Sequence, residues 1–250
     1  MRAILGRDTE ITKYSAQDLV DFTRKSPARK KKPGHECYVC PIYEGLVYVK
    51  HNGIQMEAAH PFDNAFCKKS VEPRSYLNLA YIDDVKELDS IEETLDTVKK
   101  HPVAATIPIF EPEFSSIGEK IYWRPTSTIS KYVNTHGINI TGVGKGENGE
   151  KYVWAKSSGG LKFGVGGYLK ISIEMMMMCL TTGRYGPFID NPFPPLSKFV
   201  YPTLLSKEAE EARQILDKEK ESKRLEEEER KRLEKESKRL EEERKRHARG

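Results

Sequence analysis

The side chains best suited to chemistry lie between residues 35 and 67, where three cysteines and three histidines gather. Cys37 and Cys40 form a Cys-x-x-Cys pair, and His60 and Cys67 follow later, separated by six residues. Thiolate and imidazole are ligands that Zn²⁺ prefers, and four of them close a structural tetrahedron. The spacing therefore predicts zinc as a cofactor, held by Cys37, Cys40, His60 and Cys67.

Other uses of these side chains stay open at this point. His35 could take the place of His60 as a ligand, and Cys67 could sit in the core as a small hydrophobic residue. Without metal, the same stretch would hold buried thiols and ordinary surface histidines.

A β-hairpin is expected to position the two ligand pairs. Residues 46–50 are rich in β-formers, residues 54–58 alternate apolar with polar, and Asn52-Gly53 between them is a pair typical of tight turns. With its knuckle and hairpin, the stretch resembles zinc-ribbon and treble-clef modules, although its second pair is His-x6-Cys rather than Cys-x-x-Cys. The resemblance implies a small zinc-stapled module.

The treble-clef resemblance extends in part to HNH nucleases. His60-Pro61 and Asn78 resemble fragments of that motif, in which a histidine activates water and an asparagine orients the site. This resemblance implies a metal-dependent nuclease with His60 as the base. The acidic residue expected directly before the histidine is missing.

The remaining chain alternates helical and extended patterns. Ser15 is expected to cap a short helix, and Ser90 begins a capping box ahead of a helix at 91–100. Asn148-Gly149 is expected to form a hairpin turn within a β-rich stretch. The other expected elements are strands at 76–82 and 103–110, with Pro108 favouring an edge position, a short helix at 128–135 ended by Gly137, and β-structure from Ile138 onward.

The end of the chain is a charged repeat. Glu221-Ser-Lys-Arg-Leu-Glu-Glu-Glu228 recurs from Glu236 to Glu243, and acid-to-base pairs at i,i+4 are frequent. Leu225, Leu233 and Leu240 supply about one leucine per heptad, which is thin for a coiled-coil seam. A long, solitary charged helix is predicted, with a coiled-coil dimer as the alternative and a protein partner along the helix as a further expectation.

Basic side chains offer a contact surface for nucleic acid. The formal net charge of +4 is small, so the clustering of charge matters more than its sum. A basic run occupies residues 24–32, and lysines are interleaved with aromatic residues after residue 144. The predicted contacts to DNA or RNA are Arg24, Lys25, Arg29, Lys30, Lys31, Lys32, Lys145 and Lys156.

The fold class expected is α+β, with one globular domain. Its predicted divisions are an N-terminal helix and basic arm (1–34), a zinc-binding knuckle-hairpin module (35–75), an α+β core (76–205) and a charged helix (206–250). No apolar run reaches the ~18–20 residues that span a bilayer, and the start lacks a signal segment. An intracellular protein is expected, nuclear if the basic run acts in import.

Three functions follow from these patterns. The first is a non-catalytic nucleic-acid-associated or assembly protein with a structural zinc site. The second is an HNH-like nuclease using His60. The third is a structural component of a larger complex that contacts partners through its C-terminal helix.

Overall fold

The structure is a computed structural model that describes residues 2, 6–23, 40–62, 73–123, 125–179 and 189–247. The chain divides into two compact units. The sheet unit comprises Met1–Thr12, Cys40–Val47 and Asp83–Thr203, and the helical unit comprises Lys13–Val39, Tyr48–Ile82 and Leu204–Gly250.

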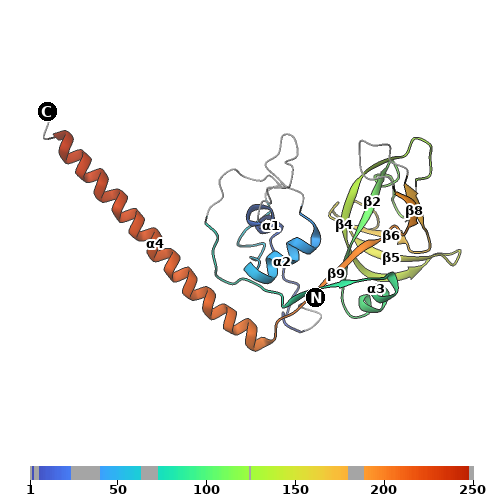
Figure 1. The fold of residues 1–250 in the computed structure, drawn as a ribbon, viewed down its shortest axis with the longest axis horizontal. Coiled ribbons are helices and arrows are strands. Elements are labelled where there is room, and N and C mark those ends of the chain that lie inside the picture. The colour runs from blue at the N-terminus through green and yellow to red at the C-terminus, as the bar shows by residue number, and fades with distance from the viewer. Residues whose placement is uncertain are drawn as a thin grey trace. The chain divides into compact units, whose positions relative to one another are not determined.

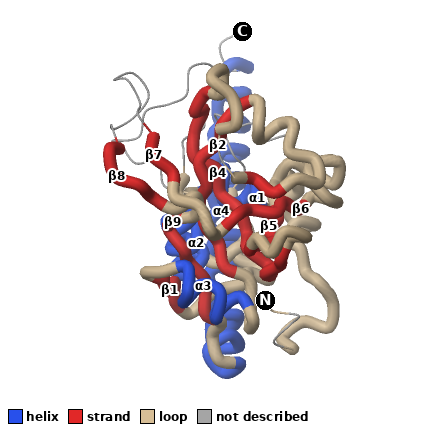
Figure 2. Tube along the Cα trace, turned by 90° about the vertical axis from the view of Figure 1, so that its right-hand side faces the viewer, coloured by secondary structure: helices blue, strands red, loops and turns tan. Residues whose placement is uncertain are grey.

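A mixed sheet dominates the sheet unit (Figure 1). Among the described residues it has seven strands in the order β1-β9-β2-β4-β5-β6-β3, antiparallel except for the parallel pair β3 and β6. The bounds are β1 (Asp84–Leu88), β2 (Val103–Glu111), β3 (Ile121–Tyr122), β4 (Lys131–Lys145), β5 (Lys151–Lys156), β6 (Tyr168–Ser172) and β9 (Ser197–Thr203). Strands β7 (Met177–Cys179) and β8 (Ile189–Phe193) form a separate antiparallel pair (Figure 2).

One face of the central strands forms the core. Ile140 on β4, Val153 and Ala155 on β5, and Ile171 on β6 are all 0% exposed. Successive side chains of a strand point to opposite faces, so the intervening residues of these strands lie on the other face. The hairpin between β4 and β5 turns at Asn148-Gly149, where Gly149 has a φ of 85°, which confirms the predicted turn.

The pairing between strands β2 and β9 ends before Pro108. The pairing of β2 with β9 ends at Thr106, while the pairing with β4 continues past Pro108. Beyond that point the Tyr122 hydroxyl hydrogen-bonds the backbone of β2 in place of β9: it accepts from the backbone N–H of Phe110 at 2.9 Å and donates to the carbonyl of Pro108 at 2.9 Å. Pro108 is therefore tolerated in an inner strand because its stretch of β2 has an open side.

Helix α3 (Ile91–Val98) packs against the sheet, contacting β4, β1 and β2. The Ser90 hydroxyl accepts from the Glu93 N–H at 3.1 Å, and the Glu93 carboxylate accepts from the Asp89 N–H at 3.1 Å. The capped helix predicted from residue 91 is thus confirmed.

The expected hairpin at 46–58 is wrong, because helix α2 (Ile42–Asn52) occupies its first half. Gly45 and Val49, four residues apart, are the buried positions, which is a helical spacing. Gly53 has a φ of 70° and its N–H donates to the Val49 carbonyl. The Asn-Gly pair therefore ends a helix, since positive φ serves a helix C-terminus as well as a tight turn.

Two other predicted elements are also wrong. Residues 128–135 do not form a helix, because β4 begins at Lys131 and pairs with β2 from its first residue. Residues 76–82 do not form a strand: Asn78 has a φ of 57°, and a single bridge joins Ala80 to Ile54. The strand in this region, β1, starts at Asp84.

A buried ion pair organises the helical unit. Helix α1 (Ala16–Phe22) begins at Ser15, whose hydroxyl accepts from the Asp18 N–H, as predicted. Asp18 is fully buried, and Arg74 donates to both of its carboxylate oxygens, at 2.8 and 2.7 Å. Arg74 also donates to the carbonyls of Asn52 and Gly53, so one guanidinium ties α1 to the end of α2.

Helix α4 (Lys207–His247) confirms the predicted long charged helix. Its first part contacts residues 76–81 of the same unit: the Tyr81 hydroxyl donates to Asp217 at 2.8 Å, and Glu221 accepts from the Tyr76 N–H at 3.0 Å. Beyond this contact, Leu225, Leu233 and Leu240 are about half exposed. None of the helices in the described part of the chain is long and apolar enough to span a membrane.

Candidate active site

His136 lies on β4 and faces the same side of the sheet as the core. It shares the strand alternation of the buried residues Ile138 and Ile140, yet its imidazole is only partly buried. The following residue, Gly137, faces the side chain of Ile42 at the start of α2. A half-buried imidazole at the edge of a core can reach both solvent and protein partners.

Ser157 is the hydrogen-bonding partner of His136. It follows β5 directly, is 7% exposed, and its hydroxyl lies 3.5 Å from Nε2 of His136. The same hydroxyl accepts from the N–H of Gly159 at 3.3 Å, and the backbone N–H of Ser157 donates to the Gly167 carbonyl. These bonds fix the hydroxyl in place beside the imidazole.

Two phenylalanines form the apolar side of this site. The Phe114 ring is edge-on to His136 with 5.8 Å between centroids, and Phe163 lies 5.0 Å from Phe114. A side chain at Gly159 would come within 2.8 Å of the Phe163 ring, so Phe163 occupies the space that a larger residue at 159 would need. Burial lowers the pKa of His136 below its ordinary value, because desolvation disfavours the imidazolium.

Glu113 anchors the loop that carries Phe114. Its carboxylate accepts from the backbone N–H and the hydroxyl of Thr126, at 2.8 and 2.9 Å, and from the Ser130 hydroxyl. Burial works to raise the pKa of Glu113, but these hydrogen bonds outweigh it and lower the pKa to about 2. Phe114 is thereby held against His136 by a charged residue next to it in the chain.

The arrangement suits proton transfer. Nε2 of His136 faces Ser157, and within the described residues of the sheet unit Nδ1 has no hydrogen-bond partner. A positioned imidazole with one nitrogen oriented and the other open can exchange a proton with a nucleophile. His136 is therefore the residue that the geometry marks for acid–base chemistry.

The predicted zinc ligands are not brought together as a site in the described residues. Cys37 and Cys67 lie outside the described residues, and Cys40 is an exposed free thiol. His60 is bound elsewhere, with Nε2 2.9 Å from the Asp21 carboxylate. Across the residues that the structure describes, no group of three or more His, Cys, Asp or Glu side chains could hold a metal ion.

The predicted nucleic-acid contacts fall in two places. Lys145 ends β4 as an exposed residue, and Lys156 ends β5 with its amine over the Tyr168 ring. The others lie outside the described residues, namely Arg24, Lys25, Arg29, Lys30, Lys31 and Lys32. Asn78, the second residue of the nuclease hypothesis, occupies a turn.

Sequence reasoning missed His136 and Ser157. The expectation of a helix at 128–135 ended by Gly137 hid the strand that carries His136. Once residues 131–145 are read as a strand, the spacing of His136, Ile138 and Ile140 places the histidine on the core face. Ser157 has no such signal, because only the pairing of β4 with β5 brings it to His136.

Comparison with known proteins connects this geometry to a family. Residues 2–185 match the family described as papain family cysteine protease. Cathepsin M of Mus musculus is 29% identical over 177 residues, covering 68% of this chain and 50% of that protein. A cathepsin L-like proteinase of Phaedon cochleariae is 29% identical over 160 residues, covering 63% and 45%. The chain thus spans about half the length of the curated relatives it matches.

Solved structures agree at the level of the fold. The bromelain protease from Ananas comosus in complex with the E64 inhibitor superposes with a TM-score of 0.56 at 18% identity, covering 81% of this chain and 82% of that one. The proform of the ragweed pollen cysteine protease Amb a 11 gives 0.56 at 23% identity, covering 82% and 55%.

These matches overturn several expectations. The fold is a papain-like mixed α+β fold with a sheet, and the zinc-ribbon or treble-clef-like module is wrong. The family match also contradicts all three predicted functions: the non-catalytic nucleic-acid-associated or assembly protein, the HNH-like nuclease and the structural component. The prediction of a zinc cofactor is wrong as well, because papain-type catalysis uses Cys, His and Asn side chains. The nuclear location has no support from the family.

Proposed function

Because this chain belongs to the papain family of cysteine proteases, we propose that it supplies the histidine of a thiol peptidase site and acts on peptide bonds. This proposal rests on the environment of His136: Nε2 lies beside the Ser157 hydroxyl, and Nδ1 has no hydrogen-bond partner within the described part of the sheet unit. Papain-like proteases use a Cys-His-Asn constellation, in which the third residue orients the imidazole. Here a serine hydroxyl holds that orienting position.

In the proposed reaction, Nδ1 of His136 takes the proton of a cysteine thiol, and the thiolate attacks the carbonyl carbon of the peptide bond. The C–N bond then breaks as Nδ1 gives its proton to the leaving amine, which leaves a thioester on the cysteine. Water attacks the thioester while Nδ1 takes its proton, and the acid product leaves as the thiol forms again. Each proton therefore passes through one nitrogen of His136.

The nucleophilic cysteine that pairs with His136 has to be identified by experiment. Papain and cathepsin nucleophiles stand in the pattern C-G-[SA]-C-[WY], and none of Cys37, Cys40, Cys67 and Cys179 stands in such a pattern. Cys40 is exposed and belongs to the same unit as His136, two residues before the Ile42 that faces Gly137. It is the first thiol to test.

The test combines peptide hydrolysis with labelling of the full chain by a peptidyl epoxide, an electrophile that traps nucleophilic thiols. We expect one cysteine to be labelled, and mass spectrometry of the digest identifies it. The rates of labelling and hydrolysis should fall about 10²- to 10⁴-fold in His136→Gln, the range for general acid–base catalysis. The matched control is His51→Gln, which removes an exposed histidine in the last turn of α2.

A Cys40→Ser variant separates the two outcomes for the nucleophile. Loss of the label in this variant assigns the thiol to Cys40, and retention assigns it to another cysteine. No hydrolysis and no labelling of the unaltered chain, or equal labelling in His136→Gln, would contradict the proposal. The intracellular location and a protein partner along α4 stay predictions.

A further inference from the structure

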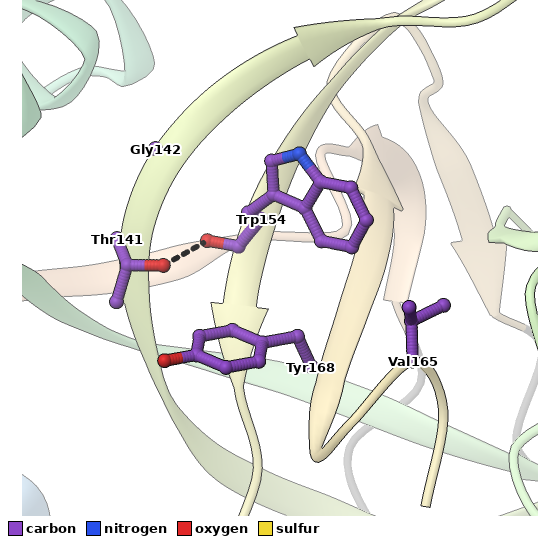
Figure 3. A pocket seen from close by; sticks show the side chains of 5 residues that line it. All are labelled: Thr141, Gly142, Trp154, Val165 and Tyr168. Atoms are coloured by element: carbon purple, nitrogen blue, oxygen red, sulfur yellow. Dashed lines mark hydrogen bonds between the residues drawn. The ribbon is translucent and has the colours of Figure 1, made fainter.

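A pocket lies on the face of the sheet opposite His136. It is lined by Thr141, Gly142, Trp154, Val165 and Tyr168, with a volume of about 360 Å³. Figure 3 shows the Trp154 indole, the Tyr168 ring and the Val165 side chain gathered around it. Trp154 lies between the buried residues Val153 and Ala155, so it points away from the core face that His136 shares.

The walls of this pocket offer little to a neutral polar ligand. The Thr141 hydroxyl already donates to the Trp154 carbonyl at 3.3 Å, the bond drawn in Figure 3. The other lining side chains are a valine and two aromatic rings, and the Tyr168 hydroxyl and the Trp154 indole N–H are the remaining side-chain polar groups. Placing an amide or hydroxyl against such walls without a partner is unfavourable, so the part of a ligand that enters should be apolar.

Two lysines lie beside the same rings. In the register of β5 with β6, Trp154 is opposite Lys170, and Lys156 is opposite Tyr168. The amine of Lys170 lies 5.3 Å from the Trp154 ring centroid, and that of Lys156 lies 6.0 Å from the Tyr168 centroid. Each aromatic wall of the pocket therefore has an ammonium group directly across the strand pair.

In the described part of the chain, no Asp or Glu oxygen lies within 4.0 Å of the Lys156 or Lys170 amine. The charge next to the apolar pocket is thus positive and open to a ligand anion. A lysine amine is a compact charge with three donors, which suits a single carboxylate at the mouth of a pocket.

Charge and lining together define the occupant. It must place an apolar side chain between Trp154 and Tyr168 and an anion beside the two lysines. We propose that this pocket binds the C-terminal residue of a peptide that ends in a large apolar side chain, with the terminal carboxylate paired to Lys156 and Lys170. The site is separate from the one at His136 and does not require the peptidase reaction.

The experiment uses N-acetyl-phenylalanine as the probe and its neutral amide as the matched ligand. The chain has two tryptophans, so Trp123→Phe, at an exposed position, leaves Trp154 as the single fluorescent reporter. Titration of that variant should change Trp154 emission with the acid, and the amide should bind at least tenfold more weakly. Raising the salt concentration should weaken binding of the acid only.

Variants assign the contacts. Lys156→Met and Lys170→Met keep the apolar stems of the lysines and remove their charge, and each should weaken the acid at least threefold while leaving the amide unchanged. Lys162→Met, at an exposed loop position, is the control and should change neither. His136→Gln should retain binding of the acid. Equal affinity for acid and amide, no effect of either lysine variant, or loss of binding in His136→Gln would overturn the proposal.

Discussion

The ring of Phe114 meets His136 edge-on at 5.8 Å, and the residue before Phe114 is the carboxylate that anchors its loop. An apolar ring on one side of an imidazole removes water that would otherwise solvate the imidazolium. The loop from Glu111 to Lys120 thus contributes to the burial that lowers the pKa of His136, a residue on β4 that it does not hydrogen-bond.

Replacing Phe114 should change the titration of His136. In Phe114→Ala, water reaches the ring and the pKa of His136 should rise toward its ordinary value, because the desolvation that lowers it is relieved. The ring-proton shifts of His136, assigned with His136→Gln, measure this pKa. Phe114→Leu keeps the site apolar and should leave the pKa nearly unchanged; a pKa that is equally unmoved in Phe114→Ala would show that the ring does not shield His136.

Ser157 should control the tautomer of His136. A hydroxyl can donate to Nε2 or accept from it, whereas the amide oxygen of asparagine only accepts. Ser157→Asn should therefore keep the proton on Nε2 and leave Nδ1 as the base, raising peptidase activity if His136 is the catalytic group. Ring-nitrogen shifts report the tautomer independently of activity.

Ser157→Ala tests the same contact by removal. It deletes a hydrogen bond of about 1 kcal/mol, so activity should fall about fivefold. Unchanged nitrogen shifts in both variants, measured on folded protein, would mean that Ser157 does not orient the imidazole.

The pH dependence of stability should carry the signature of His136. Its pKa is lower in the folded state than the ordinary value of about 6.5 expected for the unfolded chain. Between these two values the unfolded state binds more protons, so the free energy of unfolding rises with pH there and falls as pH drops below about 6.5. Urea unfolding from pH 5 to 8 should show this slope in the unaltered chain and a flatter one in His136→Gln. Parallel curves would contradict the expectation.

Glu113 acts in a lower window. Its pKa of about 2 lies below its ordinary value, so its contribution to stability is complete above about 4.5 and is lost as pH falls toward 2. The two groups can therefore be separated by pH.

Arg74 should be irreplaceable by lysine in the helical unit. Its guanidinium reaches both oxygens of the fully buried Asp18 and two carbonyls at the end of α2, a geometry that one ammonium cannot reproduce. Arg74→Met leaves a buried carboxylate without its cation and should cost about 3–5 kcal/mol in the free energy of unfolding. Chemical denaturation measures this loss, and Arg74→Lys should recover only part of it.

The control for Arg74 is Arg230→Met on the exposed part of α4. Arg230 pairs with Glu227 in solvent at 2.8 Å, and such pairs contribute about 0–1 kcal/mol. Similar losses from Arg74→Met and Arg230→Met would show that the buried ion pair does not organise this unit.

Local signals in the sequence were read correctly where one short-range interaction decides the structure. Ser15 and Ser90 cap helices because their hydroxyls accept from backbone N–H groups three residues on. Asn148-Gly149 turns a hairpin, and the charged repeat forms α4. Each depends on neighbours within a few residues.

The failures have a common physical origin. The pair Asn52-Gly53 indicates a positive φ, which fits both a hairpin turn and the end of a helix. Only the burial of Gly45 and Val49, which is known from the structure, shows that a helix precedes the pair. The pairing of His136 with Ser157 spans 21 residues and exists only through the register of β4 with β5. The spacing of the cysteines, by contrast, is visible in the sequence, but the zinc site that it predicts is wrong, because the family does not use a metal.

The Tyr122 hydroxyl bears on how the sheet avoids self-association. Where β9 ends, β2 would present the Phe110 N–H and the Pro108 carbonyl to any passing extended peptide. Unpaired strand edges of this kind recruit further strands and lead to aggregation. The buried Tyr122 hydroxyl hydrogen-bonds both backbone groups, so a side chain replaces the neighbouring strand at this edge. Tyr122→Phe would leave both backbone groups unpaired with almost no change in the volume of the core.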